Sequence, residues 1–264
     1  MSKIIAVDLD GTLLNSNKKC LPGTKNYLKS LKQQGYIIVI ATGRILNSAK
    51  GAIEKGDFVN YIVSDAGAII YNNDTGKIEK QSRINKEYIE KILERFDESW
   101  EKMAICNQDY YNIYSMENYS YQKYDKKIEG KEKFLQECNN ITHMNISLKD
   151  FSKVQQLKEE LSKLIPELNF TIMQDSFSDR QWIEIFNIGI SKYEAIKEIA
   201  QVEKISNNDI ICFGDGLNDV DMIQRSGVGV AMGNALPQVK ESADFVTLSN
   251  DENGIKYFLE EYLG

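Results

Sequence analysis

The sequence predicts an α/β fold: a Rossmann-like core built on a parallel sheet, with an α+β domain inserted into it. Three observations lead to this prediction. Over the first eighty residues, apolar runs typical of buried strands alternate with stretches typical of helices. From about Arg83 to Glu184 the expected strands become amphipathic and rich in tyrosine. After Ser191 the first pattern returns, so we expect both ends of the chain to build one sheet.

The first half of the core is expected to open with the apolar strand Ile4–Val7. The next helix is delimited by turn residues, with Pro22-Gly23 before it and Gly35 after it. A hairpin loop is expected at residues 72–76, Asn-Asn-Asp-Thr-Gly. In order, the expected elements are strand Ile4–Val7, helix Thr24–Gln34, strand Tyr36–Ala41, short helix Ala49–Glu54, strand Tyr61–Val63 and the hairpin strands Ala68–Tyr71 and Lys77–Glu79.

The inserted segment, residues 83–184, is expected to contain amphipathic helices and strands. These are helices Asn85–Phe96 and Lys149–Leu164 and strands Leu168–Gln174 and Gln181–Phe186. Six tyrosines crowd residues 110–124, where they either line a pocket for an aromatic or sugar group or pack half-exposed strands; we favour packing. His143 is the single histidine, so it completes neither a metal site nor a catalytic triad, and we expect a structural role.

The core is expected to comprise residues 1–82 and 185–264, because strands and helices alternate again after Ser191. The expected elements are helix Lys192–Gln201, strand Ile210–Phe213, helix Asp219–Gln224, strand Val228–Ala231, helix Leu236–Glu241, strand Phe245–Val246 and helix Ile255–Tyr262.

Composition excludes several classes of protein. The net charge of −7 disfavours nucleic acid and anionic membranes as partners. No apolar run approaches the roughly 18 residues of a membrane span, and the N-terminus does not resemble a signal peptide. The four cysteines are scattered without a CxxC motif, as is typical of reduced thiols. We therefore expect a cytoplasmic protein; its oligomeric state is left open.

Two carboxylates, Asp8 and Asp10, follow the first expected strand and precede the turn Gly11-Thr12. Like charges this close resist joint ionisation unless a cation lies between them. One carboxylate beside a metal can act as a nucleophile while its neighbour carries protons. A short acidic pair is also typical of helix caps and calcium sites, so the pair alone does not decide its function.

Two further positions suit an anion. Thr42 and Gly43 follow the second strand, where a hydroxyl and an open backbone suit a phosphoryl oxygen, although taken alone these residues favour a plain strand-to-loop turn. Ser191-Lys192-Tyr193-Glu194 fits a capping box, which places Lys192 in the first turn of a helix. A cation there opposes the helix dipole unless an anion binds nearby; the alternative is a solvated surface lysine.

A third acidic run, residues 214–219, follows the strand Ile210–Phe213. Asp215 and Asp219 are hard oxygen ligands of the kind that magnesium prefers, and Asn218 lies between them. A turn with a helix cap is the alternative, but the run has more acids than a cap needs. All these features fall at the carboxyl ends of expected strands or at helix starts, where open α/β sheets bind ligands.

The whole chain resembles the haloacid dehalogenase-like (HAD) superfamily, and specifically its Cof-type phosphatases of type IIB, which carry a large α/β cap. The motifs that carry this resemblance occur in the family's order. They are DLDGTLL at 8–14, ATGR at 41–44, Lys192, GDGLNDVDM at 214–222, VAMGNA at 230–235 and SNDENGI at 249–255.

The resemblance implies an enzyme that hydrolyses small phosphorylated metabolites, such as sugar phosphates, through an aspartyl-phosphate. Asp8 is then the nucleophile, and Asp10 is the acid that protonates the leaving group and the base that activates water. The remaining implied roles are phosphate binding by Thr42, Gly43, Lys192 and Asn218, and Mg²⁺ binding by Asp8, the backbone carbonyl of Asp10, Asp215 and, in support, Asp219. The insertion is then a cap that sets substrate specificity.

The chain departs from the family pattern at two places. Ala66-Gly67-Ala68 stands where relatives often have Asn-Gly-Ala, and Tyr193 stands where many have glycine. Both departures leave the substrate open. Two alternative functions also remain: a phosphomutase, which passes the phosphoryl group to a second hydroxyl, and a non-catalytic aspartyl-phosphate sensor. A sensor needs a slowly hydrolysed acyl phosphate, and a base at Asp10 argues against it.

Overall fold

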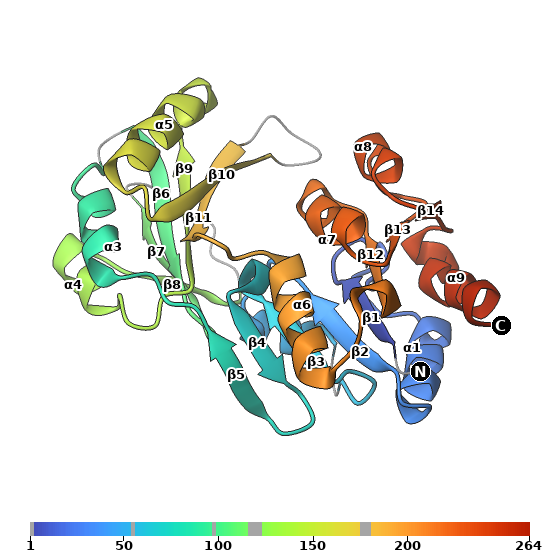
Figure 1. Ribbon diagram of the computed structural model, residues 1–264. Coiled ribbons are helices and arrows are strands. Elements are labelled where there is room, and N and C mark those ends of the chain that lie inside the picture. Colours follow the sequence, from blue (N-terminus) through green and yellow to red (C-terminus); the bar gives the residue numbers. More distant parts are fainter. Residues whose placement is uncertain (1–2, 54–55, 97–98, 116–122, 175–180) are drawn as a thin grey trace. The chain divides into compact units, whose positions relative to one another are not determined.

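The computed structural model describes residues 3–53, 56–96, 99–115, 123–174 and 181–264 (Figure 1). The chain divides into two compact units, one formed by Met1–Lys80 with Ser191–Gly264 and the other by Gln81–Ile190. The first unit therefore comes from both ends of the chain, and the second comes from the continuous segment between them. The predicted fold class, α/β with a central parallel sheet, is confirmed.

The first unit is built on an eight-stranded sheet with the order β14-β13-β12-β1-β2-β3-β4-β5. The strands from β14 to β3 pair in parallel, and β4 pairs antiparallel with β3. The bounds are β1 Ile4–Asp8, β2 Ile37–Ala41, β3 Tyr61–Ser64, β4 Ile69–Asn72, β5 Lys77–Gln81, β12 Ile210–Gly214, β13 Val228–Ala231 and β14 Phe245–Val246.

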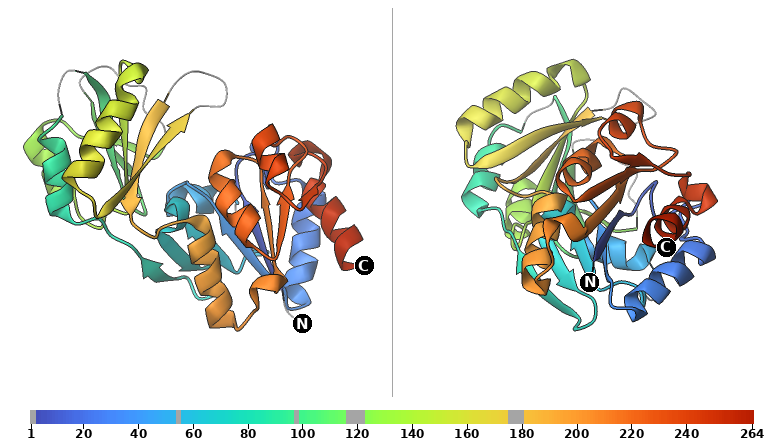
Figure 2. Two further views of the ribbon diagram at one scale, coloured as in Figure 1. Left: turned by 45° about the horizontal axis from the view of Figure 1, so that its top comes forward. Right: turned by 45° about the vertical axis from the view of Figure 1, so that its right-hand side comes forward.

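Helices cover both faces of this sheet, because the central strands are apolar on both sides. In β1, Ile5 and Val7 pack into one core with α1 and α9, whereas Ile4 and Ala6 pack into a second core with α6. Figure 2 shows the sheet between α6 (orange) and the pair formed by α1 (blue) and α9 (red). The bounds are α1 Pro22–Gln33, α2 Leu46–Ala52, α6 Lys192–Glu203, α7 Val220–Arg225, α8 Pro237–Glu241 and α9 Gly254–Leu263.

The second unit is a six-stranded sheet, ordered β10-β11-β9-β6-β7-β8, with the helices α3, α4 and α5 on one face (Figure 1). Its strands pair antiparallel except for β7 and β8. One apolar core joins all three helices to alternate residues of the strands. The bounds are β6 Trp100–Cys106, β7 Tyr111–Ser115, β8 Asp125–Lys127, β9 His143–Leu148, β10 Leu168–Gln174, β11 Gln181–Asn187, α3 Lys86–Leu93, α4 Lys131–Gln136 and α5 Val154–Leu164.

Two predicted helices begin more than two residues from the expected position. The helix predicted at Ala49–Glu54 spans Leu46–Ala52, and among the described residues no side chain caps its first turn, so no capping residue marks its start in the sequence. The helix predicted at Lys149–Leu164 is a 3₁₀ turn at Phe151–Lys153 followed by α5, because the Asp150 side chain caps the turn by accepting from the Ser152 N–H. The elements β6 to β9 and α4 were not predicted.

The features left open by the sequence have structural explanations. His143 is buried, with its ring stacked 5.2 Å from that of Phe186 and edge-on to Tyr111 at 6.3 Å, as expected of a structural residue. The ring centroid of Tyr114 lies 4.9 Å from that of Phe96 and 5.5 Å from that of Phe134, so this tyrosine packs against other aromatic rings. Tyr119 and Tyr121 lie outside the described residues. None of the four cysteines forms a disulfide, and within the described ranges no helix is both long and apolar enough to cross a membrane.

Candidate active site

The predicted site residues of the first unit lie at the carboxyl ends of neighbouring strands. Asp8 ends β1, Thr42 follows β2 and Asp215 follows β12, while β2 and β12 flank β1 on either side. Asp219 ends the 3₁₀ turn Leu217–Asp219, and Lys192 is the first residue of α6. The fold therefore gathers residues that are up to 211 positions apart in the sequence, the separation of Asp8 and Asp219.

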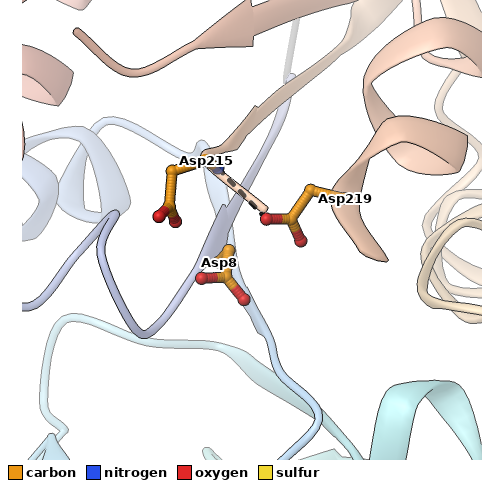
Figure 3. Close-up of side chains that lie close together, drawn as sticks. All are labelled: Asp8, Asp215 and Asp219. Atoms are coloured by element: carbon orange, nitrogen blue, oxygen red, sulfur yellow. Dashed lines mark hydrogen bonds between the residues drawn. The ribbon is translucent and has the colours of Figure 1, made fainter. Parts of the chain in front are cut away.

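Three carboxylates converge at this edge, those of Asp8, Asp215 and Asp219 (Figure 3). One oxygen from each lies within 4.8 Å of the others. Burial and the charge of Asp219 raise the pKa of Asp8 well above its usual range, and burial raises that of Asp215 to about 6. Three acids held this close in a buried place need positive charge between them. Because every donor is a carboxylate oxygen, the cluster suits a hard divalent cation.

Lys192 supplies positive charge to the same cluster. Its Nζ lies 2.7 Å from Oδ1 of Asp8 and 2.6 Å from Oδ1 of Asp219, and the side chain is only 3% exposed. Burial alone lowers the pKa of this lysine, but the two carboxylates outweigh burial and raise it. The lysine is therefore a buried cation aimed at the carboxylates, which excludes the solvated surface lysine of the sequence-based alternative.

The start of α6 holds Lys192 in place. Ser191 caps the helix by accepting from the Glu194 N–H, and its own hydroxyl donates to Asp221 at 2.8 Å. The Glu194 carboxylate accepts from Arg225 at 2.5 Å. The serine half of the predicted capping box is therefore confirmed, while the Glu194 side chain pairs with Arg225 of α7.

Close backbone packing fixes the two aspartates after β12. Asp219 accepts from the backbone N–H groups of Asp215 and Gly216 at 3.1 and 3.0 Å, and Figure 3 draws the first of these bonds. A Cβ on Gly214 would lie 2.4 Å from that of Asp219, so only glycine fits there. The Thr12 hydroxyl donates to Oδ1 of Asp215 at 2.8 Å. These contacts orient both carboxylates.

Asp10 does not join the three-carboxylate cluster through its side chain. Arg44 donates to both carboxylate oxygens of Asp10, with Nε 2.7 Å from Oδ2 and Nη2 2.6 Å from Oδ1. Nζ of Lys18 lies 3.3 Å from Oδ1. Burial raises the pKa of Asp10, but the bonds from Arg44 outweigh it and the pKa is lowered. Neither cation was assigned a role from the sequence, although Arg44 belongs to the ATGR motif.

The remaining predicted anion-binding residues differ in exposure. Thr42 is 2% exposed, and its hydroxyl accepts from the Arg44 N–H at 3.2 Å. Gly43 is exposed, and in the described part of the chain no atom beyond its two neighbouring residues lies within 4 Å of the place where a Cβ would stand, so space is open beside it. Asn218 is exposed on the turn before Asp219. Gly43 thus leaves an open backbone position beside the buried Thr42.

The first family departure, after β3, is a strained loop that joins two parts of the site. Asp65 and Ala66 have φ values of 51° and 52°, which non-glycine residues rarely adopt. The N–H of Asp65 donates to the Arg44 carbonyl at 2.9 Å and that of Ala66 to the Thr42 carbonyl at 3.0 Å. A Cβ on Gly67 would lie 2.2 Å from the Ser191 carbonyl. This loop connects the loop after β2 to the start of α6, a role the sequence did not reveal.

The second departure, Tyr193, is part of the core. Its side chain is 6% exposed, its hydroxyl donates to Asn207 at 2.9 Å, and the Arg225 guanidinium lies 4.1 Å from its ring. Tyrosine at this position therefore serves packing within the first unit.

Comparison with known proteins agrees with this geometry. The family model of haloacid dehalogenase-like hydrolases matches residues 5–259. Phosphatase YwpJ of Bacillus subtilis is 27% identical and covers 99% of this chain and 100% of its own. A second relative from the same organism, 5-amino-6-(5-phospho-D-ribitylamino)uracil phosphatase YitU, is 26% identical over 98% of this chain and 97% of its own.

Solved structures share the fold over the full length. A haloacid dehalogenase-like hydrolase from Bacteroides thetaiotaomicron superposes with a TM-score of 0.83 at 25% identity, covering 99% of both chains. The HAD subclass IIB sugar phosphatase BT4131 superposes with a TM-score of 0.77 at 21% identity, also covering 99% of both. The predicted superfamily is thereby confirmed, and the chain belongs to the haloacid dehalogenase-like hydrolases and is an enzyme of that family.

Proposed function

We propose that this enzyme is a magnesium-dependent phosphatase that hydrolyses small phosphorylated metabolites through a phosphoryl group carried on Asp8. The observation that carries the proposal is the contact of buried Asp8 with Lys192 beside two further carboxylates at the carboxyl ends of the strands. A nucleophilic carboxylate, a fixed cation and a set of hard oxygen ligands are the groups that phosphoryl transfer requires.

In the first step, an Asp8 oxygen attacks the phosphorus atom, and the bond from phosphorus to the leaving-group oxygen breaks. Asp10 gives a proton to that oxygen, so the product leaves as an alcohol. In the second step, Asp10 removes a proton from water, the water oxygen attacks the phosphorus, and Asp8 is released with inorganic phosphate. Because Arg44 occupies both oxygens of Asp10, the pair has to loosen when substrate binds.

Positive charge has to balance the phosphoryl oxygens throughout. Lys192 holds one of them, and Thr42 and Gly43 offer a hydroxyl and an open backbone edge; Asn218 is proposed to approach the phosphate from the other loop. Mg²⁺ would be held by Asp8, Asp215 and the Asp10 backbone carbonyl, with Asp219 in support, and it supplies charge neutralisation at the phosphoryl group. The donor set fits this ion because it consists of oxygen atoms only.

The substrate class is proposed from the relatives. YwpJ is named a phosphatase, YitU acts on a phosphorylated ribitylaminouracil, and BT4131 is named a sugar phosphatase. We infer a phosphomonoester of a small polar metabolite. The second unit is proposed to act as the cap that selects among such substrates, because all the proposed chemical groups lie in the first unit.

Two alternatives make different predictions in the same assay. A phosphomutase would transfer the phosphoryl group to a second hydroxyl of the substrate, and a sensor would keep it on Asp8. Asp10 opposes the sensor, since a base beside the acyl phosphate shortens its lifetime. We also propose that the protein works in the reducing cytoplasm, which suits four cysteines that form no disulfide.

The test is hydrolysis of p-nitrophenyl phosphate with and without Mg²⁺ by the wild type and Asp8→Asn. Steady turnover that needs Mg²⁺ and disappears in Asp8→Asn is the expected result, because an amide of the same shape is a poor nucleophile. Release of one equivalent per chain without turnover would support the sensor. Retention of a tenth or more of the wild-type kcat in Asp8→Asn would exclude Asp8 as the nucleophile.

A further inference from the structure

Two asparagines from separate loops hold the backbone of the segment that follows β1. Asn234, in the loop after β13, donates from Nδ2 to the Gly11 carbonyl at 2.8 Å. Asn250, which begins the 3₁₀ turn Asn250–Glu252, donates from Nδ2 to the Leu14 carbonyl at 2.8 Å. The backbone N–H of Asn250 donates in turn to Oδ1 of Asn234 at 3.0 Å. The two asparagines are therefore linked to each other, and their side chains hold both ends of one turn.

The same C-terminal segment also contacts Ser16 in this loop and Thr24 in the first turn of α1. Asp251 accepts from the backbone N–H and the hydroxyl of Ser16 at 3.0 and 2.6 Å. Asn253 accepts from the backbone N–H and the hydroxyl of Thr24, both at 3.1 Å. The VAMGNA and SNDENGI motifs, to which the proposed chemistry assigns no step, thus bind the loop that carries Asp10.

Gly11 connects these hydrogen bonds to the residues of the proposed active site. It has a φ of 81°, and a Cβ on it would lie 2.2 Å from Oδ2 of Asp215, so the turn is pressed against that carboxylate. Asp10 precedes Gly11, and Thr12, whose hydroxyl donates to Asp215, follows it. The carbonyl that Asn234 holds belongs to the peptide group between Gly11 and Thr12. It therefore lies next to the residue that orients a proposed metal ligand and one residue after Asp10, which is proposed to move protons.

We propose that Asn234 is a positioning residue for phosphoryl transfer: by holding the Gly11 carbonyl, it fixes the turn that places Asp10 and the Thr12–Asp215 contact. Asn234 touches no reacting group. It is exposed on the loop after β13, so its truncation removes little buried surface. This inference rests on the proposed roles of Asp10 and Asp215.

The test compares three variants of the full chain with the wild type. Asn234→Ala removes both hydrogen bonds of the side chain, and Asn234→Asp keeps the acceptor for Asn250 but loses the donor to Gly11. Asn207→Ala is the matched control, because Asn207 is an exposed asparagine that donates to a backbone carbonyl, that of Arg225, at 3.0 Å and accepts from Tyr193 at 2.9 Å. It lies before β12, at the end of the strand opposite the site.

Three readouts are measured: kcat and KM for p-nitrophenyl phosphate at saturating Mg²⁺, the urea unfolding midpoint, and hydrogen exchange of peptides covering residues 9–16. We expect both Asn234 variants to lose kcat by about ten- to a hundredfold, the scale of misplaced catalytic groups, with KM changed less than about threefold. Exchange in the 9–16 peptides should rise in both variants. The Asn207→Ala control should keep kcat within about twofold, with unchanged exchange in those peptides.

The inference is overturned if Asn234→Ala keeps kcat within about threefold of the wild type, or if Asn234→Asp, which cannot donate to Gly11, is fully active. Unchanged exchange in the 9–16 peptides also overturns it. These results differ from a failure of the proposed function. In that case the wild type and the Asn207→Ala control would themselves show no Mg²⁺-dependent turnover, and the inference would fall with the function on which it rests.

Discussion

Replacing Lys192 by methionine removes a buried cation from between two buried carboxylates. The lysine lies 2.7 Å from Asp8 and 2.6 Å from Asp219, and all three side chains are nearly inaccessible, at 3%, 7% and 1% exposure. Methionine keeps most of the volume of the side chain, so the loss is mainly electrostatic. Breaking a buried ion pair costs about 3–5 kcal/mol, because the partner charge is left uncompensated. We expect the metal-free variant to lose about this much unfolding free energy.

The assay is urea unfolding in EDTA, repeated at millimolar Mg²⁺. The matched control is Lys197→Met on the same helix, because Lys197 is 47% exposed and pairs with Glu194 at 3.6 Å; such surface pairs contribute about 0–1 kcal/mol. Mg²⁺ should stabilise Lys192→Met more than the wild type, since the ion supplies the missing positive charge. A metal-free Lys192→Met within about 1 kcal/mol of the wild type would refute the reasoning, because it would mean that the lysine does not compensate the carboxylates.

Three further predictions concern single side chains. Asp10→Asn should lower kcat by about 10²–10⁴-fold, the range for general acid–base catalysis, while Mg²⁺ affinity falls far less than in Asp215→Asn; equal losses of affinity would contradict the division of roles. Burial raises the pKa of Asp215 from its usual 3.8 to about 6, so the folded protein binds this proton more tightly than the unfolded chain. Its contribution to the stability of the metal-free protein is therefore present below pH 4 and is lost as the pH rises from 4 to 6; unfolding curves of the wild type and Asp215→Asn across this range test the sign. Asn112→Leu should raise the unfolding free energy by about 1–3 kcal/mol, because neither polar atom of this buried amide has a hydrogen-bond partner among the residues that the structure describes; a destabilised variant in urea unfolding would contradict this.

The parallel core was predictable because its strands are buried on both faces. Ile4–Val7 and Ile210–Phe213 are continuous apolar runs, and the structure extends each by one residue at its carboxyl end, to Asp8 and Gly214. The strands of the second unit gave a weaker signal. In β6, a register shift between Trp100 and Lys102 breaks the alternation of buried and exposed residues, so no period of two is visible in the sequence.

The site residues that could be predicted are those whose local sequence carries the chemistry. Asp8, Asp215 and Asp219 lie in acidic runs after apolar strands, and the sheet order brings them together. The contacts of Arg44 and Lys18 with Asp10 were missed because the fold brings these residues together across 34 and 8 positions. No sequence spacing predicts such a contact. The bracing by Asn234 was missed for the same reason, since its bond to Gly11 spans 223 residues.

The catalytic roles and the magnesium ion stay predictions until they are measured, and the account depends most on a phosphoryl group carried by Asp8. The direct measurement is mass spectrometry of acid-quenched peptides from Asp10→Asn, mixed rapidly with substrate and Mg²⁺. Slow hydrolysis in this variant should let the intermediate accumulate, so the account predicts one added phosphoryl group on Asp8 and none in Asp8→Asn. Turnover that proceeds with no phosphorylated peptide, or with the group on another residue, would contradict it.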